Sequence, residues 1–450
     1  MVLIIIFAVL LLTAIGVIAF MTTQKGIGVI FSNPIVIGLV FFTIIHFLLP
    51  MMQVSSTYYR YQTDYNFSTL FIVLILVLFG QVIFILFFSS FKIDYFKLFN
   101  NIKVSDKEIK RILAVNFIVF LIGAIMIYKN ASIILSIGVT EYLRDRSSFG
   151  QGKAIQLLLA HWIYISAFIY IFTYFITKTK KLKRRALFLG LLAFGLSVFY
   201  YMINSNRNSL FIVFILIGAI WIIRNQSLNT KLNSKQAKRL LSITLLGTLA
   251  FILFFNIGKE RYALYSKHKK DFKYSTVKSL NGAFGNNENI LWLYENGHPL
   301  YYGQTYVAGF TNFVPRSLWA NKPLGAGPKI KNLIYPDSYV LGKAKNSSLT
   351  TGLFTELQMN FGILGMIIFP AIFAIVMGFI LRVMNKSGFL IVKMLSFFTG
   401  VVFFTQIYHA EFLGFFSRYI ISIIPFMLIY IAGKFKLGTY KPQNLNKAIS

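Results

Sequence analysis

The feature that most constrains this chain is a series of long apolar runs that recurs along the whole sequence. A helix needs about 20 apolar residues to cross the hydrocarbon core of a bilayer. Runs of this kind occur at 2–21, 33–52, 68–90, 112–128, 154–177, 186–203, 208–224, 240–257, 353–381, 387–407 and 415–432. The sequence therefore predicts an all-α polytopic membrane protein with about eleven transmembrane helices, the first of them an uncleaved anchor.

The positive charge of the chain gathers in every second loop between these runs. The formal net charge is +32, and the basic loops are 91–111, 178–185, 225–239 and the tail 433–450. Short loops rich in Lys and Arg stay in the cytoplasm, so the alternate loops and the N-terminus are predicted to lie outside. Charge spread over membrane loops in this way does not indicate a nucleic-acid-binding protein.

One loop differs from all the others in length and composition. Residues 258–352 separate a first group of eight predicted spans (1–257) from a last group of three (353–432). The segment mixes Tyr, Trp, Asn, Gly and Pro with isolated charges, and its part from Lys259 to Lys278 is amphipathic. Loops of this length are usually functional, so we expect a small extracytoplasmic cap with short helices.

Several kinds of chemistry are excluded or find no support. The chain has no Cys, which excludes disulfides, thiolate metal sites and cysteine nucleophiles. No Gly-rich loop ends in Lys-Ser or Lys-Thr, and no Ser is framed as a nucleophile elbow. The five His residues have no metal-site spacing. We expect no metal and no cofactor.

Arg207 is the first candidate functional residue, in the short turn SNRNS between two apolar runs. A guanidinium is always charged and can hold phosphate oxygens through two hydrogen bonds. The alternative is an interfacial Arg whose side chain extends to water.

A second candidate site is the stretch 312–323, in which two Pro residues bracket Arg316, Trp319 and Lys322. Such a stretch could be a preorganised site, with the cations holding phosphate and the indole lying against a sugar. It could equally be a rigid turn around a packed Trp.

Acidic residues near the last spans form the third candidate set. Glu356 lies close to the start of a long apolar helix, where a carboxylate is costly and suits a general base. The alternative is an acid stabilised by the helix dipole. His409, Glu411 and Arg418 flank the short loop 408–414, where Glu411 and Arg418 could share a helix face or form a structural ion pair.

Two motifs resemble a known family. They are Pro315-Arg-x-x-Trp-x-x-Lys-Pro323 in the large loop and Thr351-Gly-x-x-x-Glu-x-x-x-Asn-x-Gly-x-x-Gly365 after it. Together with the predicted topology, they resemble the O-antigen and capsule repeat-unit polymerases of bacteria, the Wzy type. A more distant likeness is to O-antigen ligases, which carry a His where this chain has Thr351.

The resemblance implies a GT-C-like transferase in the bacterial cytoplasmic membrane, with its active site on the outer face. The expected substrate is an undecaprenyl-diphosphate-linked oligosaccharide, whose glycan is joined to the next lipid-linked repeat unit. A chain-length regulator and a flippase are expected partners. The roles it implies are a general base, with Glu356 first and Glu411 and His409 next; diphosphate binding by Arg207, Arg316, Lys322 and Arg418; and glycan stacking on Trp319, Tyr301 and Tyr302.

Three other functions fit the same topology: a flippase, a ligase and a non-catalytic scaffold of the polysaccharide machinery, which would not need Arg207, Arg316 and Glu356 to converge. A flippase for lipid-linked repeat units should show internal repeats and helices broken near the midplane, and no repeat is found in the sequence. A ligase is chemically close to a polymerase, and the missing His argues against it.

Overall fold

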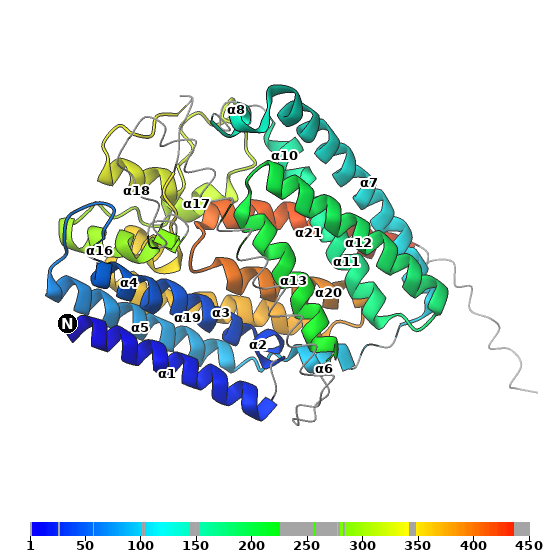
Figure 1. Ribbon diagram of the computed structural model, residues 1–450, viewed down its shortest axis with the longest axis horizontal. Helices are drawn as coiled ribbons and strands as arrows, with labels where there is room; N and C mark the ends of the chain where they lie inside the picture. The colour runs from blue at the N-terminus through cyan, green and yellow to red at the C-terminus, as the bar shows by residue number, and fades with distance from the viewer. Residues whose placement is uncertain are drawn as a thin grey trace, which may run out of the picture.

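The computed structural model is helical, with no β-strand among the residues that it describes (Figure 1). The described residues are 2–25, 28–56, 58–100, 104–144, 153–225, 284–341 and 348–435, together with Ile102, Phe149, Ile252, Asn256, Val277, Leu280 and Asn281.

The helices follow the predicted apolar runs and add short helices between them. In chain order they are α1 (Val2–Lys25), α2 (Val29–Ser32), α3 (Pro34–Thr43), the π-helical turn η1 (Ile44–Leu48), α4 (Leu49–Ser56), α5 (Phe67–Ser89), α6 (Tyr95–Asn100), α7 (Asp106–Ile137), α8 (Val139–Arg144), α10 (Ala154–Ala160), α11 (Trp162–Ile176), α12 (Lys180–Ile203), α13 (Arg207–Asn225), α16 (Asn286–Asn296), α17 (Gln304–Phe310), α18 (Ala326–Ile334), α19 (Leu353–Lys386), α20 (Leu390–Gln406) and α21 (Phe412–Phe435).

Eight helical stretches in the described part of the chain are long and apolar enough to cross a membrane. They are Val2–Thr22, Pro34–Ser56, Phe67–Ser89, Asp106–Ile137, Ile155–Ile176, Lys180–Ile203, Leu353–Lys386 and Phe412–Lys434. Two further predicted spans appear as shorter apolar helices, Asn208–Arg224 and Leu390–Gln406. The predicted span 240–257 lies outside the described residues. A multi-pass membrane protein is thus confirmed, whereas eleven spans and a GT-C-like architecture stay predictions.

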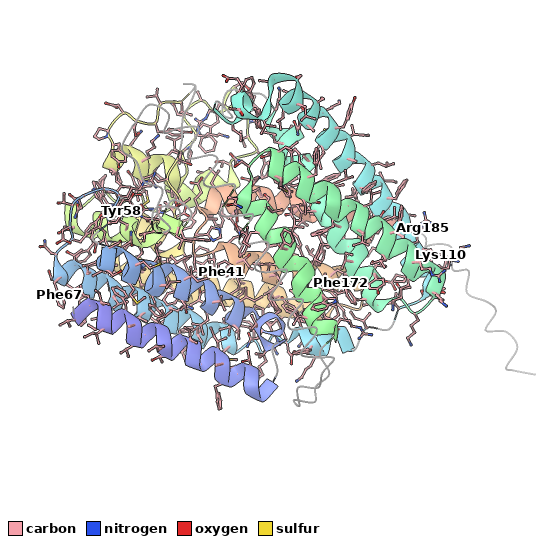
Figure 2. The ribbon with its side chains drawn as sticks, in the orientation of Figure 1. Phe41, Tyr58, Phe67, Lys110, Phe172 and Arg185 are labelled. Atoms are coloured by element: carbon pink, nitrogen blue, oxygen red, sulfur yellow. The ribbon has the colours of Figure 1, made fainter. Side chains whose placement is uncertain are left out.

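The two ends of the molecule differ in the loops that they gather. Lys110 and Arg185, from two of the basic loops, lie together at one end (Figure 2). Tyr58 and Phe67 lie at the opposite end, where α16 and the start of α1 are also found (Figures 1 and 2). This grouping agrees with the alternation of basic loops. Which end faces the cytoplasm stays a prediction from those loops.

Helix α11 lies inside the bundle, and all its residues from Trp162 to Thr173 are buried. The helices that cover it are α7, α12, α13 and α21. Glycines bring these neighbours close: a Cβ on Gly123 of α7 would lie 2.8 Å from the backbone nitrogen of Ile163. Gly190 of α12 meets Ile171 in the same way. Small residues at helix contacts are typical of membrane proteins.

Helix α19 is interrupted at Gly362, whose backbone has φ +65° and ψ −153°. The residues before this point fold back along the residues after it. Gly80 of α5 packs against the ring of Phe354 and also against Pro370, although a straight helix would separate these two by about 24 Å. The segment 353–361 is therefore a short helix of its own, packed beside the first turns of a span.

In its described part, the predicted large loop contains the short helices α16, α17 and α18. Helix α16 contacts α5 and α19, and α17 contacts α19 and α21. The amphipathic stretch from Lys259 to Lys278 falls almost wholly outside the described residues, so its predicted helix is not tested here.

Candidate functional site

Glu356 is the centre of the candidate site, with a side chain only 2% exposed. One carboxylate oxygen accepts a hydrogen bond from the hydroxyl of Thr305 at 2.6 Å, and the other accepts the backbone N–H of Phe412 at 2.7 Å. Its partners come from α17 and from the first residue of α21. The carboxylate therefore ties three segments together that are far apart in the sequence.

Asn360, one turn after Glu356, completes this arrangement. Its amide nitrogen donates to the Thr305 hydroxyl and to the carbonyl of Glu356, both at 2.7 Å. Its amide oxygen accepts the backbone N–H of Gly303 at 3.0 Å. The Glu and Asn of the second motif thus hold the start of α17 in place, which explains why both occur on one helix face.

Glu411 precedes α21 and reaches the first turn of α18. A carboxylate oxygen accepts the backbone N–H of Gly327 at 2.7 Å, which satisfies one of the free donors at that helix end. A Cβ on Gly325 would lie 2.8 Å from the same oxygen. Burial raises the pKa of the Glu411 carboxyl, while the Gly327 N–H and the Arg418 guanidinium act in the opposite direction.

Arg418 lies on α21 close to Glu411. Its Nε donates to the carbonyl of Gly414 at 2.9 Å, which fixes the side chain along its own helix. Both charged groups lie beside Gly414. A Cβ built on this glycine would lie 3.8 Å from one Nη of Arg418 and 3.7 Å from the second carboxylate oxygen of Glu411. Within the described residues the Nη groups have no hydrogen-bond acceptor. The guanidinium therefore keeps donors that a ligand could use.

Two buried tyrosines, Tyr164 and Tyr201, belong to the surroundings of Arg418. Tyr164 lies 3.3 Å from the hydroxyl of Ser422, one turn after Arg418, and Tyr201 lies 2.7 Å from Nδ1 of His161. Both tyrosines lie in the neighbourhood of the guanidinium. This end of α21 is thus polar inside an otherwise apolar bundle.

His409 is buried against aromatic rings and a pair of amides. Its Nε2 lies 3.3 Å from the side-chain oxygen of Asn208, and Asn208 and Gln406 exchange two hydrogen bonds. Burial, helped by the Arg418 guanidinium, lowers the pKa of His409 to about 3. The imidazole is therefore neutral at physiological pH and accepts protons poorly, which favours a carboxylate as the base.

Arg207 begins α13, directly before Asn208. This position places its backbone next to the amide pair that contacts His409. The Arg207 side chain lies outside the described part of the structure, so the predicted anion clamp is not tested.

Arg316 and Lys322 direct their hydrogen bonds into their own loop. An Nη of Arg316 donates to the carbonyls of Ala320 and Lys322. Lys322 Nζ donates to the carbonyls of Asn312 and Val314 at 3.0 and 2.8 Å. Burial and the nearby Arg316 lower the pKa of Lys322. These contacts stabilise the turn, which corresponds to the rigid-turn alternative for this motif.

The predicted sugar-stacking residues lie at the surface of the same segment. Trp319 is 41% exposed and Tyr302 is 77% exposed. Tyr301 is half-buried, and the ammonium of Lys329 lies 3.8 Å from its ring centroid. Trp319 and Tyr302 therefore keep open faces, whereas Lys329 covers one face of Tyr301.

The most heavily bonded buried acid was not singled out from the sequence. Glu288 of α16 is fully buried, and its carboxylate accepts the backbone N–H groups of Arg60 and Tyr61 and the side-chain amides of Gln53 and Asn281. Burial raises its pKa. With all its acceptors used, Glu288 joins the 58–66 loop to α16 as a structural residue.

The surrounding Asn residues of α16 have the same joining role. Asn286 donates to the carbonyl of Tyr408, Asn287 lies 3.1 Å from Nδ1 of His46, and Asn289 donates to the carbonyl of Thr350. The sequence signal was present as Asn-Asn-Glu-Asn at 286–289, an unusually polar run for a buried helix.

The structure thus brings together Glu356, Glu411, Arg418 and His409. The turn that holds Arg316, Lys322 and Trp319 adjoins this cluster, because the side-chain amide of Asn312 donates to the hydroxyl of Ser417, the residue before Arg418, at 2.8 Å. Among the described residues, no group of three or more His, Asp or Glu side chains could hold a metal ion.

Comparison with models of known protein families finds no match, and no curated protein or solved structure matches the chain.

Proposed function

We propose that the chain is a glycosyltransferase that joins undecaprenyl-diphosphate-linked oligosaccharide repeat units into a surface polysaccharide at the outer face of the bacterial cytoplasmic membrane. The observation that carries the proposal is the cluster of Glu356, Glu411 and Arg418. Two carboxylates and a guanidinium with unused donors meet beside the ends of several spans. A lipid-linked diphosphate substrate needs this combination of charges next to a membrane.

The reaction assigns a separate task to each charge. The hydroxyl oxygen of the acceptor sugar attacks C1 of the donor glycan, and the bond from C1 to the diphosphate oxygen breaks. The hydroxyl proton passes to a carboxylate, for which Glu356 is the first candidate and Glu411 the second. The negative charge that builds on the leaving undecaprenyl diphosphate is stabilised by Arg418.

The two motifs support the proposal in different ways. Glu356 and Asn360 of the second motif are buried and bonded to Thr305, as expected of residues that shape a site. Arg316 and Lys322 of the first motif bond to their own loop, so we now assign them to holding Trp319 in position. The open faces of Trp319 and Tyr302 suit stacking on sugar rings. Arg207 stays a candidate for binding the diphosphate of the acceptor, which is also linked to a lipid.

The test compares two Arg variants in cells whose own copy has been replaced. Arg418→Ala should collapse the glycan ladder on a gel to single repeat units, with the membrane level of the protein unchanged. Arg316→Ala is the matched control, because the Arg316 guanidinium donates its hydrogen bonds to carbonyls of its own loop. Cells in which this variant reaches the wild-type membrane level should keep long glycan chains. Normal long chains in Arg418→Ala would remove Arg418 from the mechanism.

A flippase for lipid-linked repeat units is the alternative function, although the interruption of α19 at Gly362 lies at the end of the apolar stretch and not near its middle. Broken helices that line a central site are typical of transporters. The same gel separates the two functions. Loss of a flippase removes surface glycan altogether, whereas loss of a polymerase leaves single units at the surface. A ligase variant would instead accumulate long chains on the lipid carrier.

A further inference from the structure

Helix α17 belongs to the segment expected outside the membrane, yet its aromatic contacts are with two membrane spans. The ring centroid of Tyr306 lies 5.8 Å from that of Phe373 on α19 and 5.2 Å from that of Phe412 on α21. Phe310 lies 4.7 Å from Phe416, also on α21. Helix α17 therefore fits between the ends of these two spans.

The sequence of α19 sets the depth of these contacts. After Gly362 the first charged residue is Arg382, and the apolar stretch between them is about 30 Å long as a helix, which matches the hydrocarbon core. Gly362 therefore marks one surface of that core. Phe373 lies about 16 Å below it along the helix. Tyr306 packs on Phe361, beside Gly362, and also on Phe373, so α17 extends from this surface into the hydrocarbon core.

The two faces of α17 have opposite surroundings. Thr305, Ala308 and Gly309 are buried, and Thr305 donates to the Glu356 carboxylate. On the other face, Val307 is 44% exposed and Phe310 is 62% exposed. Large apolar side chains that are exposed at this depth require an apolar solvent.

We propose that α17 is a re-entrant helix whose exposed face, Val307 and Phe310, is covered by the acyl chains of the leaflet nearest to Gly362. The N–H groups of Gln304, Tyr306 and Val307 donate to the carbonyls of Tyr301 and Gly303, which lowers the cost of placing the start of α17 at this depth. One turn of helix then separates the bilayer from Glu356. Continuity with the lipid-facing surface of α19, where Leu364 and Ile368 are 68% and 52% exposed, selects lipid as the occupant.

The absence of Cys makes a direct test possible in the full-length protein. Single Cys variants at Phe310 and Val307 are labelled with a bimane fluorophore and reconstituted into phosphatidylcholine and phosphatidylglycerol vesicles, with and without brominated acyl chains. Phe379→Cys on α19, exposed 60% within the apolar stretch that ends before Arg382, is the lipid reference. Asn296→Cys, at the exposed end of α16, is the water reference.

The expected result is a blue-shifted emission at position 310, quenched by brominated lipid to the extent seen at 379 and protected from aqueous iodide. Position 307 gives a second reading if Phe310→Cys fails to fold. Emission and iodide quenching at 310 and 307 like those at 296 would overturn the proposal. So would protection from both quenchers, because it would mean that protein, such as a second copy of the chain, covers this face.

Discussion

The backbone N–H of Phe412 donates to the carboxylate of Glu356 across 2.7 Å, and this bond sets the position of α21 relative to the segment that precedes Gly362. Glu411 is the residue before Phe412, and Arg418 follows on the same helix. A single hydrogen bond thus brings the second motif next to the acid and the guanidinium that sequence analysis placed in a different loop.

Arg418 should be essential for activity because its Nη groups have no acceptor among the described residues. We expect Arg418→Ala to lower polymer formation by about 10²–10³-fold, the usual loss when a donor to a developing anion is removed. Arg418→Lys keeps the charge but not the paired donors and should recover only part of the rate. Transfer by purified protein from lipid-linked donor to acceptor measures both. Equal activity of the Lys and Arg forms would mean that charge alone suffices.

Glu356→Gln should separate folding from catalysis. A Gln side chain can still accept the N–H of Phe412 and offer its amide to the Thr305 hydroxyl, so thermal stability in detergent should be nearly unchanged. A general base is lost, and activity should fall by about 10²–10⁴-fold. Thr305→Val should instead cost about 1–3 kcal/mol of stability, because it leaves the buried carboxylate with one donor fewer. A fully active Glu356→Gln enzyme would transfer the base role to Glu411.

The stability of the protein should fall as pH rises because of Glu411. Burial raises its folded-state pKa above the ordinary value of 4.5, so the folded state binds the proton more tightly. This contribution is complete below pH 4.5 and is lost as pH rises through the folded-state pKa. Melting temperatures between pH 4 and 7 should therefore slope less steeply in Glu411→Gln than in the wild type. Glu288, whose pKa is also raised, contributes equally to the pH dependence of the melting temperature in the wild type and in Glu411→Gln. Identical slopes would contradict the prediction.

Gly362 should tolerate no side chain. Its φ of +65° with ψ of −153° is a conformation that only glycine adopts easily, so Gly362→Ala should cost about 1–3 kcal/mol or more. Gly195 on α12 is the matched control, because a Cβ there would meet nothing within 4 Å. Gly195→Ala should leave stability unchanged or raise it by up to about 1 kcal/mol, since alanine favours a helix. Melting temperatures of the two variants, measured under the same conditions, test this prediction. Similar losses of stability at both positions would mean that the backbone conformation of Gly362 does not require glycine.

The spans could be predicted from the sequence because each is a local property of about 20 residues. Ten of the predicted runs coincide with helices in the described part of the chain, two of them as shorter apolar helices. The reversal at Gly362 could not be predicted in this way. The polar residues Glu356, Gln358 and Asn360 precede it, but polarity does not give the direction of a chain, and only the backbone angles show the break.

The candidate site was only partly predictable for a related reason. Glu356, Glu411 and Arg418 stood out because a charge in an apolar stretch is costly wherever it lies. The donors that hold them, Thr305 and Gly327, carry no such signal, and neither do the carbonyls that occupy Lys322. Hydrogen-bond partners are set by tertiary contacts, so a Lys that binds its own loop looks in sequence like one that binds phosphate.

The hydrogen bonds of the segment before Gly362 can form only in a certain order during synthesis. The N–H of Leu353 donates to the carbonyl of Ile407, and the side-chain amide of Asn286 donates to the carbonyl of Tyr408. The carboxylate of Glu356 accepts the N–H of Phe412. All three partners are synthesised after the residues that they bind, and two further apolar helices must first leave the ribosome. A nascent chain that stops before α21 carries every residue of the second motif and the carbonyls of Ile407 and Tyr408, but it lacks the N–H of Phe412 that bonds to Glu356. The hydrogen bond between Phe412 and Glu356 can therefore form only after the start of α21 has been synthesised.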